Sequence, residues 1–356
     1  MINPKKKKKA IVLSGGGAKG AYEAGAMQYI IENWGLAFDI VCGTSAGALN
    51  GFLYSNLDPC LSNKTNSQKM IQPWIDIEMN KVLSIPFKDF IKGKFNSIFD
   101  NRKLYDFINS YFTQEIQLSN IKNNILNTLI VTTGELSTGQ AHIWYVSNNT
   151  DLKLISKRWI SHKMKNLSVD HALASGAIPG IFRSVKLEDE LGINLWHNDG
   201  GVIMNTPISP TIQAGADKVL VIYLGNPETP PAELIPNIFD VMVRVGFTLV
   251  SNHLKEDIIR ATIINELLDK LGQTTFEGYK KVSLSILRPI RNLDIKTTAD
   301  LKEKYFLFKL IPEFLMTTIS GSGLFMSSKY TKILIQEGYD NAKIMHAQLE
   351  EFFNDD

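Results

Sequence analysis

The sequence predicts an α/β protein built on a parallel sheet, and the order of patterns near its start supports this. Residues 9–14 (KAIVLS) form a β-rich run that ends at glycine, and from residue 21 to residue 34 apolar side chains recur at helical spacing. Residues 39–42 form a second apolar run, followed by a helix-compatible segment at residues 46–54. Strand, helix, strand and helix in this order begin a parallel sheet with helices over its faces.

Further elements are expected along the next part of the chain. The β-rich runs at residues 127–133 and 140–146 flank a glycine-containing loop, which predicts a hairpin. A helix is expected at residues 168–175 because Ser168 can cap its start and Gly176 can end it. Apolar runs predict two more strands, at residues 194–198 and 218–224.

Composition divides the chain into two parts. Residues 56–100 are rich in Asn, Ser and Lys around one expected helix at 68–79, so we interpret them as an insertion over the sheet edge or a lid. Beyond residue 236 helical periodicity dominates, which gives a core at 9–230 and a mainly helical C-terminal region at 231–356. The elements expected in that region include a helical stretch at 238–271, a short strand at 282–287 and a helix at 342–353.

Length and charge limit the classes of protein to consider. With 356 residues and 44% hydrophobic composition, the chain can bury a large core. Its 38 basic and 36 acidic residues give a net charge of +2, which does not favour binding to nucleic acid. Residues 5–9 are five consecutive lysines, interpreted either as a solvated tail or as a weak anchor on anionic lipid. Together with the apolar stretch at residues 305–319, the second interpretation predicts weak peripheral membrane contact.

The location expected from the sequence is cytoplasmic, with export without a cleaved signal left open. The apolar run that follows the lysines breaks at Gly15, too early for a signal peptide. The apolar stretch at residues 305–319 contains Lys309 and Pro312 and is shorter than the roughly 20 residues of a membrane span. Only two cysteines occur, Cys42 and Cys60, so no disulfide framework is predicted and a reducing compartment is the default.

Two glycine-rich turns, each directly after an apolar run, carry the chemical signal. Residues 43–47 (GTSAG) match G-x-S-x-G, in which the flanking glycines allow a strained bend that exposes the hydroxyl of Ser45 as a nucleophile. Residues 15–20 (GGGAKG) can direct several backbone N–H groups at one point, which suits the oxyanion formed when a serine attacks an ester carbonyl. Together the two turns predict acyl transfer.

Other interpretations of these turns fit the sequence less well. A phosphate-binding P-loop would end in Gly-Lys-Ser/Thr, whereas Gly20 is followed by Ala21 and Tyr22. A dinucleotide site needs an acidic residue at the far end of the second strand, but Asp39 precedes that strand. Two structural alternatives stay open: Ser45 merely caps the next helix, and Asp199 belongs to an ordinary Asp-Gly turn.

Four blocks occur in a fixed order: residues 15–20, residues 43–47, residues 174–179 (ASGAIP) and residues 199–201 (DGG). This ordered set resembles the patatin-like phospholipases, lipid acyl hydrolases with a Ser/Asp dyad, over about residues 9–225. The resemblance implies a three-layer α/β/α sandwich with a mainly parallel central sheet. The largely helical C-terminal part carries no motif of the family.

The resemblance also implies roles for individual residues. Ser45 would be the nucleophile and Asp199 the general base, with the N–H groups of Gly15, Gly16 and Gly17 forming the oxyanion hole. An ordinary Asp has a pKa near 3.9 and is a weak base in water, so the dyad must be sheltered to raise that pKa. Supporting positions of the motifs are Lys19, Gly20, Gly43, Gly47, Gly200 and Gly201.

A Ser-His-Asp triad is the rival mechanism. His253 and His346 follow Asp199, and His197 precedes it by two residues, but none lies in a loop with the surroundings expected of a catalytic histidine. No C-x-x-C or H-E-x-x-H pattern occurs, so neither a metal nor a cofactor is expected.

The predicted activity is hydrolysis of carboxylic esters of membrane lipids, such as phospholipids or lysophospholipids, through an acyl-enzyme on Ser45. Two alternatives stay open at this stage: a non-catalytic lipid-binding or interaction module of the same fold, and an acyltransferase that uses the same dyad.

Overall fold

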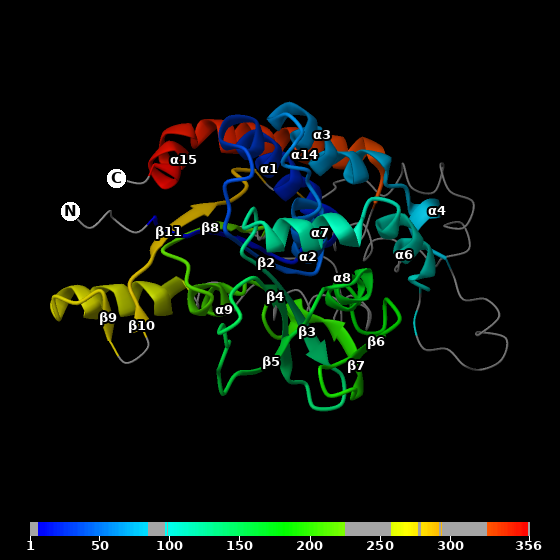
Figure 1. Ribbon diagram of the computed structural model, residues 1–356. Coiled ribbons are helices and arrows are strands. Elements are labelled where there is room, and N and C mark those ends of the chain that lie inside the picture. The colour runs from blue at the N-terminus through cyan, green and yellow to red at the C-terminus, as the bar shows by residue number, and fades with distance from the viewer. Residues whose placement is uncertain are drawn as a thin grey trace, which may run out of the picture.

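The computed structural model describes residues 6–84, 97, 99–224, 258–276, 279–291, 293 and 326–354. Its central feature is a nine-stranded, mostly parallel sheet with the order β11-β8-β1-β2-β3-β4-β5, to which β7 and β6 attach beside β3 (Figure 1). The strands are β1 (Lys9–Leu13), β2 (Ile40–Thr44), β3 (Thr128–Glu135), β4 (Ala141–Ser147), β5 (Trp159–Lys163), β6 (Val185–Glu188), β7 (Asn194–Asp199), β8 (Lys218–Ile222) and β11 (Ser283–Leu287).

Helices cover both faces of this sheet. In Figure 1, α1, α3 and α14 lie above it and α9 lies below it. The helical elements are η1 (Gly17–Lys19), α1 (Gly20–Trp34), α2 (Ala46–Ser55), α3 (Asn63–Asp76), α4 (Met79–Val82), α6 (Arg102–Asn109), α7 (Gln114–Lys122), α8 (Val169–Ser175), η2 (Gly200–Val202), α9 (Ile208–Gln213), α14 (Ser328–Ile344) and α15 (His346–Phe353).

The side chains of β1 show why the sheet is buried on both faces. Ile11 and Leu13 belong to the hydrophobic cluster that includes α1, whereas Ala10 and Val12 belong to the cluster that includes α9. The sequence of a strand that is buried on both faces is a continuous apolar run and does not alternate between apolar and polar residues. The expected α/β/α sandwich with a mainly parallel central sheet is therefore confirmed.

The sheet is parallel from β11 through β3, and the predicted hairpin is present as the antiparallel pair β3 and β4. The helix expected at residues 68–79 begins and ends earlier, as α3. Ser62 accounts for the earlier start, because its hydroxyl accepts a hydrogen bond from the backbone N–H of Thr65 and caps the helix. Within the described ranges, no helix is long and apolar enough to cross a bilayer.

The described C-terminal segments attach to the same sheet and helix layer. β11 adds a parallel strand beside β8, residues 258–270 are helical, and Thr275–Phe276 pairs with Tyr279–Lys280 in a small separate ladder. α14 approaches α1 closely: a Cβ placed on Gly338 would lie 1.9 Å from the carbonyl oxygen of Tyr22. The division near residue 230 and the lid at 56–100 remain predictions, and the apolar stretch at 305–319 lies outside the described residues.

Candidate active site

The G-x-S-x-G segment forms a tight turn between β2 and α2. Ser45 has φ 55° and ψ −121°, a backbone conformation that non-glycine residues rarely adopt. Gly43 and Gly47 make the turn possible because a Cβ on either would lie 2.2 to 2.3 Å from a backbone oxygen. The side chain of Ser45 makes no capping hydrogen bond to α2, so the alternative of a simple helix cap does not hold.

Ser45 and Asp199, 154 residues apart in the sequence, meet at this turn. The Ser45 hydroxyl donates a hydrogen bond of 2.7 Å to Oδ2 of Asp199. The other carboxylate oxygen, Oδ1, accepts the backbone N–H of Gly201 at 2.7 Å. Both side chains belong to residues that are only 6% exposed. Burial raises the pKa of Asp199 to about 6, while its hydrogen bonds to Ser45 and Gly201 oppose that shift.

The third motif block, residues 174–179, forms hydrogen bonds that hold the backbone of the turn. Ser175, at the end of α8, accepts the backbone N–H of Ser45 at 2.8 Å and donates its own hydroxyl to the carbonyl of Thr132 at 2.7 Å. The backbone N–H of Asp199 donates to the carbonyl of Ala177 at 2.9 Å. The block therefore fixes the backbone of both candidate catalytic residues, and the specific part played by Ser175 was not predicted.

The first glycine loop lies directly against Ser45. A Cβ on Gly15 would be 3.1 Å from the Cβ of Ser45, and its backbone N–H donates to Oδ1 of buried Asn205 at 2.9 Å. Gly17 has φ 57°, which glycine adopts without strain. Across the described segments, the N–H groups of Gly16 and Gly17 have no acceptor, whereas that of Gly15 does. Asn205 is another residue that sequence reasoning missed.

The other motif positions surround these two turns. Lys19 ends η1, and the next residue, Gly20, is held so close to α2 that its Cβ would lie 2.7 Å from that of Ala46. A Cβ on Gly200 would lie 2.5 Å from the carbonyl oxygen of Thr132. These contacts explain why the two glycine positions exclude larger residues.

A buried carboxyl group anchors the start of the glycine loop. Oε1 of Glu23 accepts the backbone N–H of Ser14 at 2.8 Å, and Oε2 accepts Nδ2 of Asn50 at 2.9 Å. Oδ1 of Asn50 in turn accepts the indole N–H of Trp74 at 2.8 Å. Complete burial holds the pKa of Glu23 well above its usual range. No pattern in the sequence pointed to this chain of hydrogen bonds.

The two described histidines considered for a triad lie beside hydroxyl groups other than that of Ser45. Nδ1 of His197 lies 3.1 Å from the hydroxyl oxygen of Thr133, and Nδ1 of His346 lies 2.8 Å from the hydroxyl oxygen of Tyr29. His253 lies outside the described residues. In the described part of the chain, the acceptor for the Ser45 hydroxyl is a carboxylate.

Neither cysteine forms a disulfide. Cys42 is buried in β2, where burial raises its thiol pKa to about 12, and Cys60 is exposed. Over the described ranges, no group of three or more His, Cys, Asp or Glu side chains is arranged to hold a metal ion.

The fold and the site together define a class of protein: an α/β sandwich with a mostly parallel sheet that carries a serine at a strained strand-to-helix turn. The sequence model of the patatin-like phospholipase family matches residues 11–212, which is more than half of the chain. The chain therefore belongs to the patatin-like phospholipase family. No curated protein matches the sequence.

Several solved structures resemble this one weakly. VipD from Legionella pneumophila is 13% identical with a TM-score of 0.37, over 96% of this chain and 67% of VipD. The type III effector protein ExoU is 14% identical with a TM-score of 0.40, over 98% of this chain and 54% of ExoU. Human GIVD cytosolic phospholipase A2 is 10% identical with a TM-score of 0.46, over 98% of this chain and 58% of the phospholipase chain. The chain thus spans about half to two thirds of the length of these proteins.

Proposed function

We propose that this protein hydrolyses carboxylic esters of phospholipids, lysophospholipids or related lipids through a covalent acyl-enzyme on Ser45. The observation that carries the proposal is the 2.7 Å hydrogen bond from the Ser45 hydroxyl to the buried carboxylate of Asp199. Because burial raises the pKa of Asp199 to about 6, this carboxylate is a stronger base than an ordinary Asp and is still ionised at neutral pH.

In the proposed reaction, Asp199 accepts the hydroxyl proton as Ser45 Oγ attacks the ester carbonyl. The carbonyl oxygen becomes an oxyanion, for which the N–H groups of Gly16 and Gly17 are suitable donors. The bond to the alcohol breaks as Asp199 returns its proton to the leaving oxygen, and Ser45 is left acylated. Water then attacks the acyl-enzyme, with Asp199 taking its proton and returning it to Ser45.

Fluorophosphonate labelling followed by peptide mass spectrometry tests this assignment, because only an activated serine reacts readily. We expect labelling at Ser45 that is lost in Asp199→Asn, since Asn keeps the shape of Asp but cannot accept the proton. His197→Ala and His346→Ala are the matched controls and should retain labelling. Loss of labelling in either folded histidine variant would favour a triad instead.

Hydrolysis of phospholipid vesicles provides the second measurement. Ser45→Ala should lose activity by a factor on the order of a million, as nucleophile deletion does in another serine hydrolase. Product analysis with an added alcohol separates hydrolysis from acyl transfer. Absence of both labelling and turnover in the wild-type protein would instead favour a non-catalytic lipid-binding module.

We further propose weak peripheral contact with anionic membranes through the exposed lysines at the N-terminus. Lys9 is buried in β1 and Lys8 is partly buried, whereas Lys6 and Lys7 are exposed, so the side chains of these two would carry the contact. The attraction should fade with salt, because surface charge is screened over about 8 Å at physiological ionic strength. Co-sedimentation with anionic vesicles that is equal for wild type and a Lys6→Ala/Lys7→Ala variant at low salt would refute this role.

A further inference from the structure

Four of the six histidines of the chain gather in one buried cluster, which the proposed reaction does not use. His142, His162 and His197 come from β4, β5 and β7, and His171 comes from α8; each is at most 7% exposed. The ring of Trp144 lies among them, with its centroid 4.2 Å from that of His162, 5.1 Å from that of His171 and 5.3 Å from that of His197. We call these four residues the histidine cluster.

Two of the rings already use the nitrogen that a proton would need. Nδ1 of His171 accepts the backbone N–H of Ser168 at 3.1 Å. The hydroxyl of Thr133 accepts the indole N–H of Trp144 at 2.8 Å and therefore donates to Nδ1 of His197 at 3.1 Å. The hydrogen of each ring is then on Nε2, which meets no acceptor among the described residues. A proton added to either Nδ1 would break its hydrogen bond and leave a buried charge without a partner.

The other two rings share one hydrogen bond. Nδ1 of His142 lies 2.9 Å from Nε2 of His162, and Nδ1 of His162 lies 2.8 Å from Oε2 of Glu190 in the turn between β6 and β7. The two joined nitrogens hold one hydrogen between them. Full protonation of both rings would therefore break this bond as well.

Burial lowers the pKa of His142 and His171 to about 4 and that of His197 to about 3, and neighbouring rings add to the shift. The nearby carboxyl groups act in the opposite direction at His142 and His197 but are outweighed. The carboxyl groups around the cluster are those of Glu135, Asp170, Asp189 and Glu190. Lys163, next to His162 on β5, instead donates its ammonium group to the backbone carbonyls at 149 and 150.

The histidine cluster holds the two elements that position the dyad. His197 lies two residues before Asp199 on β7, and His171 lies four residues before Ser175 on α8. Ser175 accepts the backbone N–H of Ser45 at 2.8 Å. Displacement of β7 would move the candidate base, and displacement of α8 would release the backbone of the candidate nucleophile.

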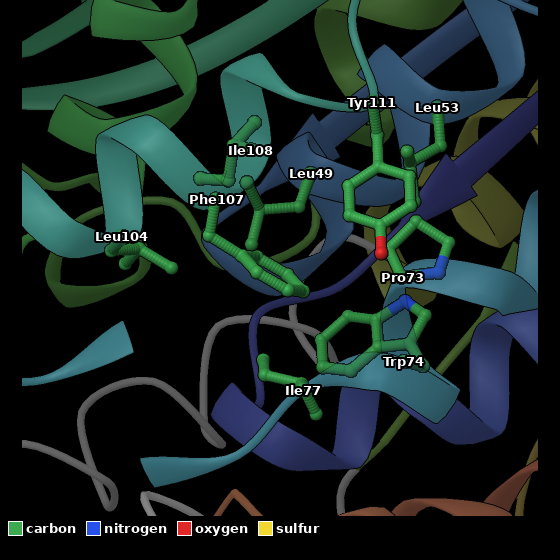
Figure 2. A pocket seen from close by; sticks show the side chains of 9 residues that line it. All are labelled: Leu49, Leu53, Pro73, Trp74, Ile77, Leu104, Phe107, Ile108 and Tyr111. Atoms are coloured by element: carbon green, nitrogen blue, oxygen red, sulfur yellow. The ribbon is translucent and has the colours of Figure 1, made fainter. Parts of the chain in front are cut away.

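The packing on the other side of Ser45 contains no such group. Leu49 and Leu53 of α2 line an apolar pocket together with side chains of α3 and α6 (Figure 2). Of the nine side chains labelled there, only that of Tyr111 is titratable, and burial and its hydrogen bond to Asp76 raise its pKa to about 12. A fall in pH therefore acts through the histidine cluster rather than through this packing.

We propose that the histidine cluster is a proton-sensitive latch, which holds β7 and α8 in place while its rings are neutral and releases them reversibly when the rings take up protons. The consequence for activity rests on the proposed function, since the latch would regulate the site formed by Ser45 and Asp199. A released histidine has an ordinary pKa near 6.5, so below that pH the open form binds more protons than the closed form. The closed form is therefore favoured less as the pH falls.

The size of the effect follows from the same linkage. Between pH 7 and pH 5, protonation of His142, His171 and His197 in the open form should raise the equilibrium constant for opening about ten-thousandfold. Asp199 opposes this about tenfold, because its pKa of about 6 in the closed form means that the closed form also takes up a proton. The expected net rise is about a thousandfold.

Hydrogen exchange measured by mass spectrometry tests the latch in the full chain and does not require turnover. After correction for the intrinsic exchange rate at each pH, the opening constant of residues 169–175 and 194–199 should rise about a thousandfold between pH 7 and pH 5. Residues 9–13 and 218–222, in β1 and β8, should stay more protected at pH 5. Protection that does not change with pH, or that is lost equally in all four segments, would overturn the latch.

His142→Gln and His197→Gln each replace one titrating ring by a neutral polar side chain. Each should reduce the rise in the opening constant about twentyfold. His346→Gln is the matched control and should leave the rise unchanged, because Nδ1 of His346 lies 2.8 Å from the hydroxyl oxygen of Tyr29, outside the cluster. An equal rise in all four proteins would show that the cluster does not respond to pH. The wild-type profile decides the proposal even if one variant does not fold.

Fluorophosphonate labelling separates the latch from the proposed function. At each pH, labelling of Ser45 should follow the closed fraction found by exchange multiplied by the ionised fraction of Asp199, and it should recover after return from pH 5 to pH 7. Labelling that follows Asp199 alone, where exchange shows the open form to predominate, would refute the control of activity by the latch. A protein that opens as expected but labels at no pH would retain the latch and refute the proposed function.

Discussion

Replacing Asp199 by Asn should make the folded protein more stable while removing the proposed activity. Asp199 is buried, and at neutral pH its ionised carboxylate has exchanged water for two hydrogen bonds, from Ser45 and Gly201. Asn has the same shape and can still accept the Gly201 N–H, but it carries no charge to desolvate. The cost of burying that charge is what raises the pKa of Asp199 to about 6.

The size of the effect follows from proton linkage. A carboxyl group whose folded pKa is raised binds more protons in the folded state, so its contribution to stability falls as pH rises from the unfolded pKa through the folded one. With a folded pKa of about 6 and an unfolded value near 3.9, the penalty at pH 7.5 is about 3 kcal/mol. Asp199→Asn removes that penalty. The gain should decrease to roughly half near pH 5 and nearly vanish at pH 4.

Urea unfolding of wild type and Asp199→Asn at pH 7.5, 5 and 4 measures the difference directly, because every other titrating group contributes equally to both proteins. A gain of about 3 kcal/mol corresponds to a rise in Tm of about 4 °C for a chain of this length. A variant that is less stable than wild type at pH 7.5, or a gain that does not change with pH, would refute the raised pKa. Asp106→Asn, at an exposed carboxyl on α6, is a control for a general effect of removing one negative charge.

Three further effects are expected. Asn205→Ala should lower kcat about tenfold to a hundredfold in ester hydrolysis with a smaller change in KM, because Gly15 loses the acceptor that positions the glycine loop. Gly338→Ala should lower the free energy of unfolding by roughly 2–4 kcal/mol, since its Cβ would lie 1.9 Å from the carbonyl oxygen of Tyr22. Burial lowers the pKa of His197 to about 3. The neutral ring therefore stabilises the fold fully above pH 6.5 and loses this contribution as pH falls, so wild type should lose about 3 kcal/mol more than His197→Gln between pH 7 and pH 4.

Each of these has a matched comparison. Asn205→Asp keeps the acceptor oxygen and should retain more activity than Asn205→Ala; equal kcat in all three proteins would contradict the anchoring role. Gly176→Ala is the control for Gly338, because its Cβ would meet no atom closer than 3.7 Å. For His197, the free energy of unfolding should fall more steeply with decreasing pH in wild type than in His197→Gln. An equal fall in both proteins would show that the pKa of this ring is not lowered.

Most of the strands that the sequence predicted are buried on both faces, although β7 and β11 were also predicted and are partly exposed. β1, β2 and β8 are continuous, mostly apolar runs of five residues each, a length that suits a buried strand and is too short for a typical buried helix. β5 (WISHK) and β6 (VKLE) are short, partly exposed and polar, so their pairing depends on neighbours rather than on their own pattern. The same holds for α6, which lies just after a polar segment and buries few of its residues.

At the site, the motif residues could be predicted and their partners could not. Ser45 occurs within a pattern that has a physical reason, because the glycines around it prevent backbone clashes. Ser175 and Asn205 bind backbone N–H groups that lie 130 and 190 residues away in the sequence. Serine and asparagine are common throughout the chain, and nothing local distinguishes the two that contact the turns.

A chain of hydrogen bonds connects α3 to the glycine loop. The indole N–H of Trp74 on α3 donates to Oδ1 of Asn50, and Nδ2 of Asn50 donates to Glu23. Glu23 in turn accepts the backbone N–H of Ser14, the residue directly before the loop. A fully buried carboxyl with a raised pKa is stabilised by these donors and is costly to leave without them. The position of the loop against Ser45 thus depends on a side chain from α3, within the very segment that composition alone sets apart from the core.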